Sequence, residues 1–381
     1  MALMIYILII CLIIAFSPRE LLWPIAFISV ALLSVSFLFF HPTIADDLYK
    51  HYIVLDSIRN ADLSFYYLTE EFEKQSPVYF LYLRIISLFN NDAILPVISG
   101  IISYSLLLIC IKNLFKDYDV MWPQKLCIIL LILMTRLIDI SSIRNILASS
   151  LFIFGLYYDL IYHKKYSIIF YILACLIHSL GFLYLTIRVL LILYNKFNKY
   201  IMGLLFIAGF TLISTYNTKL SILFSSFPII SGTFDRLGTY LSGVGLENDR
   251  IYTYVYLGIY IITLLFANFT EKKIDINNKL LQLYNYTVIF TLFTFGSILQ
   301  RETFNRARFI LIPLGILFLA FFLRTTVING RYISFDNKKN NSNGIMGYGI
   351  LLLALYIVIA LFYFGVLYIT TYNYYSTLFT F

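Results

Sequence analysis

Long runs of apolar residues recur from one end of this chain to the other, and they decide what it can fold into. Of its 381 residues, 61% are hydrophobic and only 13% are charged, whereas soluble domains carry about 25% charged residues. A bilayer offers the backbone no hydrogen bonds, so only helices and closed barrels can span it. The runs are continuous rather than alternating, which predicts helices. We therefore expect one all-α polytopic integral-membrane domain over residues 1–381.

The apolar runs predict about 12 transmembrane helices, with roughly 10 to 13 allowed by the soft boundaries of the shorter runs. Residues 2–16 lack a basic start and a cleavage site, which is typical of a retained helix rather than a signal peptide. The expected spans are residues 2–16, 21–40, 93–111, 126–141, 143–161, 166–177, 180–194, 201–216, 251–269, 281–299, 306–324 and 346–371.

The distribution of charge predicts the orientation of these spans. Lysine and arginine concentrate in short loops such as YHKKY and EKKIDINNK and in the polar linker 325–345, which places these segments in the cytoplasm. The long loops 41–92, which is acidic, and 217–250 then face the outside, as do both termini. The run PVYFLYLRIISLF, interrupted by Arg84, favours a short interfacial or re-entrant helix inside the first long loop.

Several classes of function are disfavoured by composition. The net charge of +8 is spread over loops between spans, so it indicates topology and not nucleic-acid binding. The four cysteines lie in or beside apolar runs, without the spacing of metal ligands or a disulfide framework. We expect no cofactor and no metal ion, and the surrounding partner is the lipid bilayer.

The stretch HPTIADDLYKHY follows the second expected span and contains the first candidate site residues. Adjacent carboxylates at Asp46 and Asp47 beside a membrane could share a raised pKa, which suits a general base. The alternative is a solvated loop whose acidic residues simply keep it outside.

The stretch SSIRNILASS places Arg144 between two apolar runs. At helical spacing Arg144, Ala148 and Gly155 share one stripe, and small residues are typical of closely packed helix faces in membranes. Arg144 therefore faces the packed interior, where an arginine is a functional candidate. The alternative is a structural ion pair between Arg144 and Asp139, although Asp139 could instead pair with Arg136, three residues before it.

The stretch ACLIHSLGF predicts a break between two short helices, with His178 at the outer turn. A histidine there could act as an acid, a base or a hydrogen-bond donor near neutral pH. The alternative is a structural hydrogen bond that stabilises the turn.

The stretch LQRETFNRARFILIP carries three arginines at the outer end of a late helix. At helical spacing Arg301, Asn305 and Arg308 share a face. Arg306 points elsewhere, and Glu302 could neutralise it. The alternative is that these arginines form an interfacial belt, with side chains that extend to the lipid headgroups. Arginines on the outer side run against the positive-inside tendency, and arginine matches phosphate by bidentate bonding, so an anionic lipid headgroup is the favoured ligand. Charges at mid-span are scarce, which disfavours an ion-coupled transporter.

The block from SIRNILASS to LACLIHSLGFL resembles the core of the EpsG/Wzy-type polysaccharide polymerases, with an arginine opening a helix and a later hairpin broken at a histidine. DDLYKHY resembles the family's first outer loop, QSPVYFLYLRIISLF resembles the segment after it, and FNRARFILIPL is similar to the late arginine-rich helix, in which Arg306 matches best. Ser179 departs from the proline that the family often has after this histidine.

This resemblance implies a GT-C-like fold and metal-independent polymerisation of O-antigen or related exopolysaccharide at the periplasmic face of the bacterial inner membrane. Donor and acceptor would be glycans on undecaprenyl diphosphate, and a chain-length regulator and a flippase are the implied protein partners. We hypothesise that arginines bind the diphosphate and that Asp46, Asp47 or His178 accepts the acceptor's proton. The hypothetical roles are as follows: diphosphate binding for Arg144, Arg301, Arg306 and Arg308, and support for Arg136, Tyr49 and Arg84.

Two other functions remain open at this point. An O-antigen ligase or another transferase of lipid-linked sugars would use the same types of residue. A flippase for lipid-linked oligosaccharides would also bind the diphosphate but would catalyse no reaction.

Overall fold

The computed structural model describes residues 6, 9–10, 12–14, 16–42, 47–60, 76–116, 128–129, 132, 142–197, 199–223, 257–265, 267–268, 277–297 and 301–333. Within these ranges the regular structure is helical and contains no strand. This agrees with the expected all-α class. The predicted spans 2–16 and 346–371 lie largely or wholly outside the described residues.

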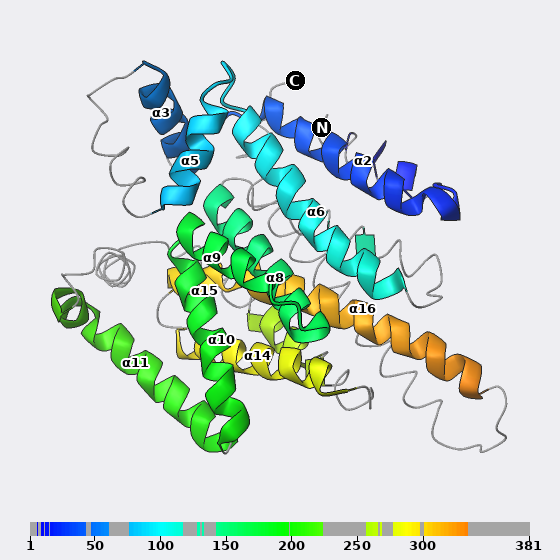
Figure 1. Ribbon diagram of the computed structural model, residues 1–381, viewed down its shortest axis with the longest axis vertical. Coiled ribbons are helices and arrows are strands. Elements are labelled where there is room, and N and C mark those ends of the chain that lie inside the picture. The colour runs from blue at the N-terminus through cyan, green and yellow to red at the C-terminus, as the bar shows by residue number, and fades with distance from the viewer. Residues whose placement is uncertain are drawn as a thin grey trace.

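Helices of very different length make up the fold (Figure 1). In chain order they are η1 (Arg19–Leu21), α2 (Leu22–Val35), η2 (Ser36–Phe39), α3 (Asp47–Asn60), α5 (Pro77–Ile86), α6 (Ile94–Lys116), α8 (Ile143–Tyr162), α9 (Ser167–Ile177), α10 (Leu180–Lys196), α11 (Lys199–Leu223), α14 (Asn277–Gly296), α15 (Arg301–Arg306) and α16 (Arg308–Ile333).

Three stretches of helix within the described residues are long and apolar enough to cross a membrane, namely Leu22–Phe39, Ile94–Lys116 and Ile143–Tyr162. Each has about the length that a bilayer's hydrocarbon core requires. They confirm the predicted spans 21–40, 93–111 and 143–161, and the chain is a helical membrane protein. The total of about 12 spans and the GT-C-like arrangement stay predictions.

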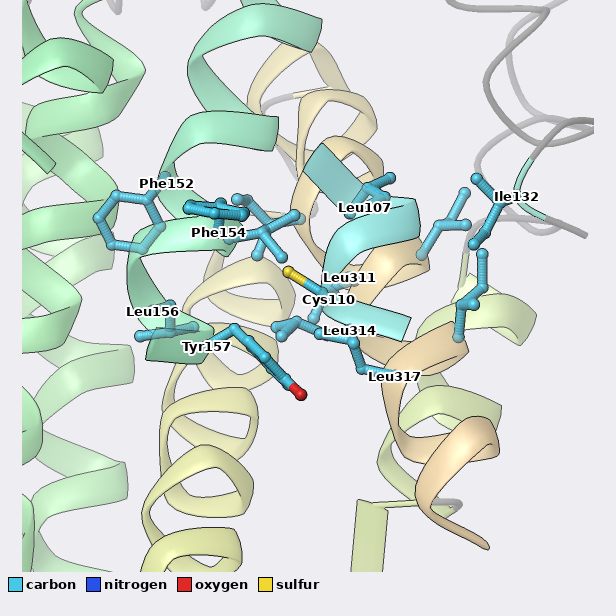
Figure 2. Close-up of a cluster of buried hydrophobic side chains, with 14 of the residues drawn as sticks. Leu107, Cys110, Ile132, Phe152, Phe154, Leu156, Tyr157, Leu311, Leu314 and Leu317 are labelled. Carbon is cyan, nitrogen blue, oxygen red and sulfur yellow. The ribbon is translucent and has the colours of Figure 1, made fainter. Parts of the chain in front are cut away.

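The centre of the molecule is built where α6, α8 and α16 meet (Figure 2). Leu107 and Cys110 of α6, Phe152 and Tyr157 of α8, and Leu314 of α16 all contribute buried side chains. Cys110 is a free, fully buried thiol, as expected for a cysteine that fills core space. The α8 helix is buried on most of its surface, so its polar first turn is held inside protein.

The predicted break at HSLG is confirmed by the hairpin of α9 and α10. Its two helices pack so closely that a Cβ atom at Gly181 would lie 2.5 Å from the backbone of Ala174. Gly155 plays a similar part where α8 meets α9, because a Cβ there would lie 3.0 Å from Phe170 and 3.1 Å from the Ser167 carbonyl. Small residues at these two points let the three helices approach.

A partly buried ion pair joins α8 and α10, and a hydrogen bond from α9 joins it. Arg188 donates from Nε to Asp159 Oδ2 at 2.8 Å, and Tyr171 donates its hydroxyl to the same oxygen at 2.9 Å. Polar side chains inside a helical membrane protein usually pair with one another in this way. This group ties the hairpin to the helix that carries Arg144.

Several loop boundaries differ from the predictions. The stretch DLYKHY forms the start of α3, whereas no helix was expected there; α3 lies beside α5 (Figure 1). The expected short helix in the first long loop is confirmed as α5. The α16 helix continues to Ile333, into the segment 325–345 that was expected to be linker, and α11 continues to Leu223, into the expected loop 217–250.

Candidate functional site

The first turn of α3 meets the first turn of α8 through an ion pair. Arg144 Nη2 lies 3.9 Å from Asp47 Oδ1. The Arg144 side chain is 11% exposed and that of Asp47 is 34% exposed, so the carboxylate is the more accessible partner. The helical stripe that turned Arg144 inward is confirmed, since Ala148 and Gly155 are buried too. Asp139, the alternative partner, lies outside the described residues.

His51 lies one helical turn after Asp47 and is completely buried. Its Nε2 atom lies 3.7 Å from Asp47 Oδ2, the carboxylate oxygen that does not face Arg144. Residues four apart on a helix share a face, which explains the pairing. Asp47 is therefore held on one side by an imidazole and on the other by a guanidinium.

Tyr79 of α5 contacts both of these groups. Its buried ring lies edge-on to His51, with 5.2 Å between centroids, and Arg144 Cζ lies 5.9 Å from the same ring's centroid, within the range of a cation–π contact. Pro77 starts α5 at a position where its missing N–H is not needed. The Tyr82 hydroxyl lies 2.9 Å from Ser99 Oγ and so ties α5 to α6.

Arg306, at the end of α15, adds a second positive charge that acts on Asp47. The Tyr260 hydroxyl donates to the Phe304 carbonyl at 2.9 Å and thereby anchors α15. A turn at Ala307 separates α15 from α16, so the late helix begins at Arg308, two residues after the start of the expected span 306–324, and continues beyond its end. Because the helix is interrupted at Ala307, the face expected to be shared by Arg301 and Arg308 does not run continuously between them.

The charges of the cluster set the protonation of Asp47. Burial would raise the pKa of Asp47, but His51, Arg144 and Arg306 together outweigh burial and hold that pKa well below its ordinary value of 3.8. The expectation of a raised carboxyl pKa is therefore not met at Asp47. Asp46, its neighbour, lies outside the described residues.

The pKa values of His51 and Tyr79 move in opposite directions for one reason. Burial lowers the pKa of His51 below 6.5, although Asp47 opposes the shift, and burial raises the pKa of Tyr79 well above 10. Desolvation disfavours the charged form of each group. Near neutral pH the cluster thus holds a neutral imidazole and a neutral phenol beside one carboxylate and two guanidinium groups.

A second set of ionic contacts secures the far end of α3. Arg59 pairs with Asp92, lies 3.0 Å from Asp56 Oδ1, and donates from Nε to the Ser87 carbonyl at 3.2 Å. Because Ser87 and Asp92 both lie between α5 and α6, this clasp closes the first long loop on itself. The α3 helix is fixed at both ends, which fixes Asp47 and His51 in turn.

The other predicted site residues either make different contacts or lie outside the described part of the chain. His178 Nδ1 accepts a hydrogen bond from the Leu180 N–H at 3.0 Å, which is the structural alternative considered for it. Arg84 is exposed on α5 and lies over Phe80, with 5.2 Å from Cζ to the ring centroid. Arg308 lies over Phe309 at 4.9 Å, and Tyr49, two residues from Asp47, points to a different face of α3. Outside the described part are Arg136 and the side chain of Arg301.

Two residues of the cluster, His51 and Tyr79, were missed by sequence reasoning. The spacing of Asp47 and His51 would have indicated a pair if DLYKHY had been interpreted as helical. Tyr79 stood inside a stretch rich in aromatic residues, so nothing distinguished it from its neighbours Phe80 and Tyr82.

The cluster's chemistry fits an anionic ligand. Arg144 and Arg306 offer two guanidinium groups, which bind phosphate through paired N–H donors. Asp47 offers a deprotonated carboxylate that is partly open to solvent. Over the described ranges, no three His, Cys, Asp or Glu side chains gather as they would around a metal ion.

Comparison with known proteins identifies a family for this chain. A protein-family model described as the EpsG family matches residues 20–377, which is nearly the whole chain. No curated protein and no solved structure matches the chain. The matched region includes Asp47, His51, Tyr79, Arg144 and Arg306, which we call the Asp47–Arg144 cluster.

Proposed function

We propose that this chain, which belongs to the EpsG family, is a polysaccharide polymerase of the bacterial inner membrane. Its substrates would be oligosaccharide repeat units of O-antigen or a related exopolysaccharide, carried on undecaprenyl diphosphate. We place the Asp47–Arg144 cluster at the periplasmic face, because the acidic first loop and the basic short loops predict that orientation. A chain-length regulator and a flippase would work beside it.

The proposed reaction is a transfer of glycan between two lipid carriers. The acceptor's hydroxyl oxygen attacks the anomeric carbon of the donor glycan, and the bond between that carbon and the diphosphate oxygen breaks with its electron pair on the oxygen. Attack from the opposite side inverts the anomeric configuration. The acceptor's proton passes to Asp47, and the lipid diphosphate leaves with the negative charge.

The protein's groups divide this work between them. Arg144 and Arg306 bind the diphosphate and stabilise the charge that develops on it as the bond breaks. Removing one such preorganised donor commonly slows catalysis by about 10²–10³-fold. The mechanism needs no metal ion, since two guanidinium groups neutralise the leaving group.

One observation carries this proposal. A carboxylate and two arginines from helices far apart in the sequence act on one another at a single site. Among the described side chains, two guanidinium groups therefore act on one carboxylate. Paired guanidinium groups favour an anionic substrate, and the partly exposed carboxylate beside them favours proton transfer over binding alone.

Deletion of the gene tests the proposed function and separates it from its competitors. In a host that builds O-antigen, a gel of lipopolysaccharide from the deletion strain should show a single repeat unit on the lipid core. A core without any glycan would indicate a ligase instead. Repeat units trapped on the cytoplasmic face would indicate a flippase, and an unchanged ladder of long chains would refute all three.

A further inference from the structure

The two carboxylate oxygens of Asp47 face different partners. Oδ1 lies 3.9 Å from Arg144 Nη2, and Oδ2 lies 3.7 Å from His51 Nε2. The partners differ in burial as well: His51 is fully buried, while Arg144 keeps 11% of its side chain exposed. One side of the carboxylate is therefore anchored in the protein, and the other faces the group that we assign to the substrate.

We propose that Asp47 acts as a stand-in anion. In the substrate-free protein it pairs with Arg144, the diphosphate-binding arginine, until a polyprenyl diphosphate displaces it. This inference rests on the proposed function, because it takes Arg144 as a diphosphate ligand. Donor binding would transfer Arg144 from Asp47 to phosphate and leave Oδ1 available to the acceptor hydroxyl. Asp47 would then serve one step of the cycle as a competitor and the next as a proton acceptor.

The geometry of the pair fits an exchangeable contact. Charge-assisted hydrogen bonds between a guanidinium and a carboxylate are about 2.7–2.9 Å long, so 3.9 Å between Arg144 and Asp47 is an ion pair without a tight hydrogen bond. A diphosphate can offer the guanidinium paired oxygens and more negative charge than one carboxylate. Arg144 therefore gains contacts when it changes partner.

His51 and Tyr79 explain why Asp47 would stay in place after the exchange. His51 cannot move away easily, because it is fully buried and lies edge-on to the buried ring of Tyr79. His51 therefore keeps Asp47 Oδ2 close to its own Nε2 atom while Arg144 changes partner. The Arg59 clasp at the other end of α3 restrains the helix as a whole.

The charges around Asp47 give the exchange a chemical consequence. Facing it are His51 from α3, Arg144 from α8, Arg306 from α15 and Tyr79 from α5, and Lys50 acts on His51. In the empty protein the two arginines keep the pKa of Asp47 low. A bound diphosphate would offset these positive charges, so the carboxylate would hold a proton more strongly only when the donor is present. Acceptor activation would then be coupled to donor binding.

The test measures binding of farnesyl diphosphate to the purified full-length protein in detergent. Asp47→Asn removes the competing charge and should tighten binding by roughly tenfold, as expected when a repelling charge beside a partly exposed anion site is removed. Asp47→Ser should do the same. Asp56→Asn is the matched control: it removes one negative charge from the same helix, at an exposed position, and should leave the affinity unchanged.

Farnesol, which has the same chain without phosphate, should bind all four proteins equally. Equal or weaker binding of farnesyl diphosphate to both Asp47 variants would overturn the inference, and so would an equal gain in Asp56→Asn or a gain for farnesol. A wild-type protein that binds farnesol but no farnesyl diphosphate would contradict the proposed function itself. Binding of the diphosphate by the wild type without a gain in the Asp47 variants would refute the stand-in anion alone.

Discussion

His51 Nε2 lies 3.7 Å from Asp47 Oδ2, one helical turn away on α3, and the histidine is fully buried whereas the aspartate is not. The buried member of this pair cannot reach a substrate in this arrangement. It can orient the exposed member and set its protonation. This relationship makes His51 a positioning residue for Asp47, and the first prediction follows from it.

Replacement of His51 by phenylalanine should change the pH dependence of polymerisation. The variant keeps a ring against Tyr79 but loses the imidazole that helps to hold the pKa of Asp47 low. The pKa of Asp47 should rise, and the carboxylate must be deprotonated to accept a proton. The acidic limb of the profile of kcat, which reports the enzyme with substrate bound, should therefore move to higher pH.

Tyr49→Phe serves as the control for this measurement, because Tyr49 lies on another face of the same helix. The profile would be recorded with purified lipid-linked repeat units over the acidic and neutral range. An acidic limb that stays at the same pH in His51→Phe, in a protein that still turns over, would mean that His51 does not act on the catalytic carboxylate.

Replacement of Gly181 by alanine should destabilise the hairpin of α9 and α10. The added Cβ would lie 2.5 Å from the Ala174 carbonyl carbon and oxygen, and these backbone atoms cannot move aside as a side chain would. Overpacking in a close-packed interior costs about 1–3 kcal/mol. Thermal unfolding in detergent should show a lower midpoint.

Gly209→Ala on α11 makes a matched comparison, because nothing lies within 4 Å of the Cβ that it would add. Alanine is the better helix former by about 1 kcal/mol, so this variant should be as stable as the wild type or slightly more stable. Equal midpoints for Gly181→Ala and the wild type would show that the two helices of the hairpin do not pack as described.

The ion pair of Asp159 and Arg188 should show strong coupling between its members. Asp159→Asn leaves the Arg188 guanidinium without its counter-charge inside the protein, which costs about 3–5 kcal/mol for a fully buried pair. The two side chains are 25% and 20% exposed, so a smaller loss of about 1–3 kcal/mol is expected. The double variant with Arg188→Met removes both charges and should be more stable than Asp159→Asn alone.

A double-mutant cycle measures this coupling directly. If the stability losses of Asp159→Asn and Arg188→Met add without coupling, the ion pair does not hold α8 to α10. Lys165→Met, which removes an exposed positive charge between α8 and α9, controls for the change in net charge.

Sequence patterns sufficed where the physical cause is local. The apolar runs predicted α2, α6 and α8, and the small residues at Ala148 and Gly155 turned Arg144 inward, because helical period and bilayer thickness act within one segment. The break at HSLG was predicted for the same reason. Each of these features can be read from fewer than about 25 consecutive residues.

The site needed information that no single segment contains. The α3 helix mixes charged and polar residues with apolar ones and gave no membrane signal, so the pair of Asp47 and His51 went unnoticed. The meeting of Asp47 with Arg144 depends on how α3 packs against α5 and how α5 packs against α9 and α6, which is a tertiary relationship. The turn at Ala307, which separates Arg306 from α16, lies in the stretch FNRARF, which contains neither glycine nor proline to indicate a turn.

The most direct test of the account concerns Arg144 in a deletion strain that carries plasmid-borne variants. Arg144→Ala should accumulate in the membrane at the wild-type level and yet leave a single repeat unit on the lipopolysaccharide. Arg144→Lys, which keeps the charge but loses the planar pair of donors, should give fewer and shorter chains. Arg84→Ala, which removes an exposed arginine outside the cluster, should restore the full ladder. A normal ladder of long chains in Arg144→Ala would contradict the assignment of Arg144 to the diphosphate of the donor.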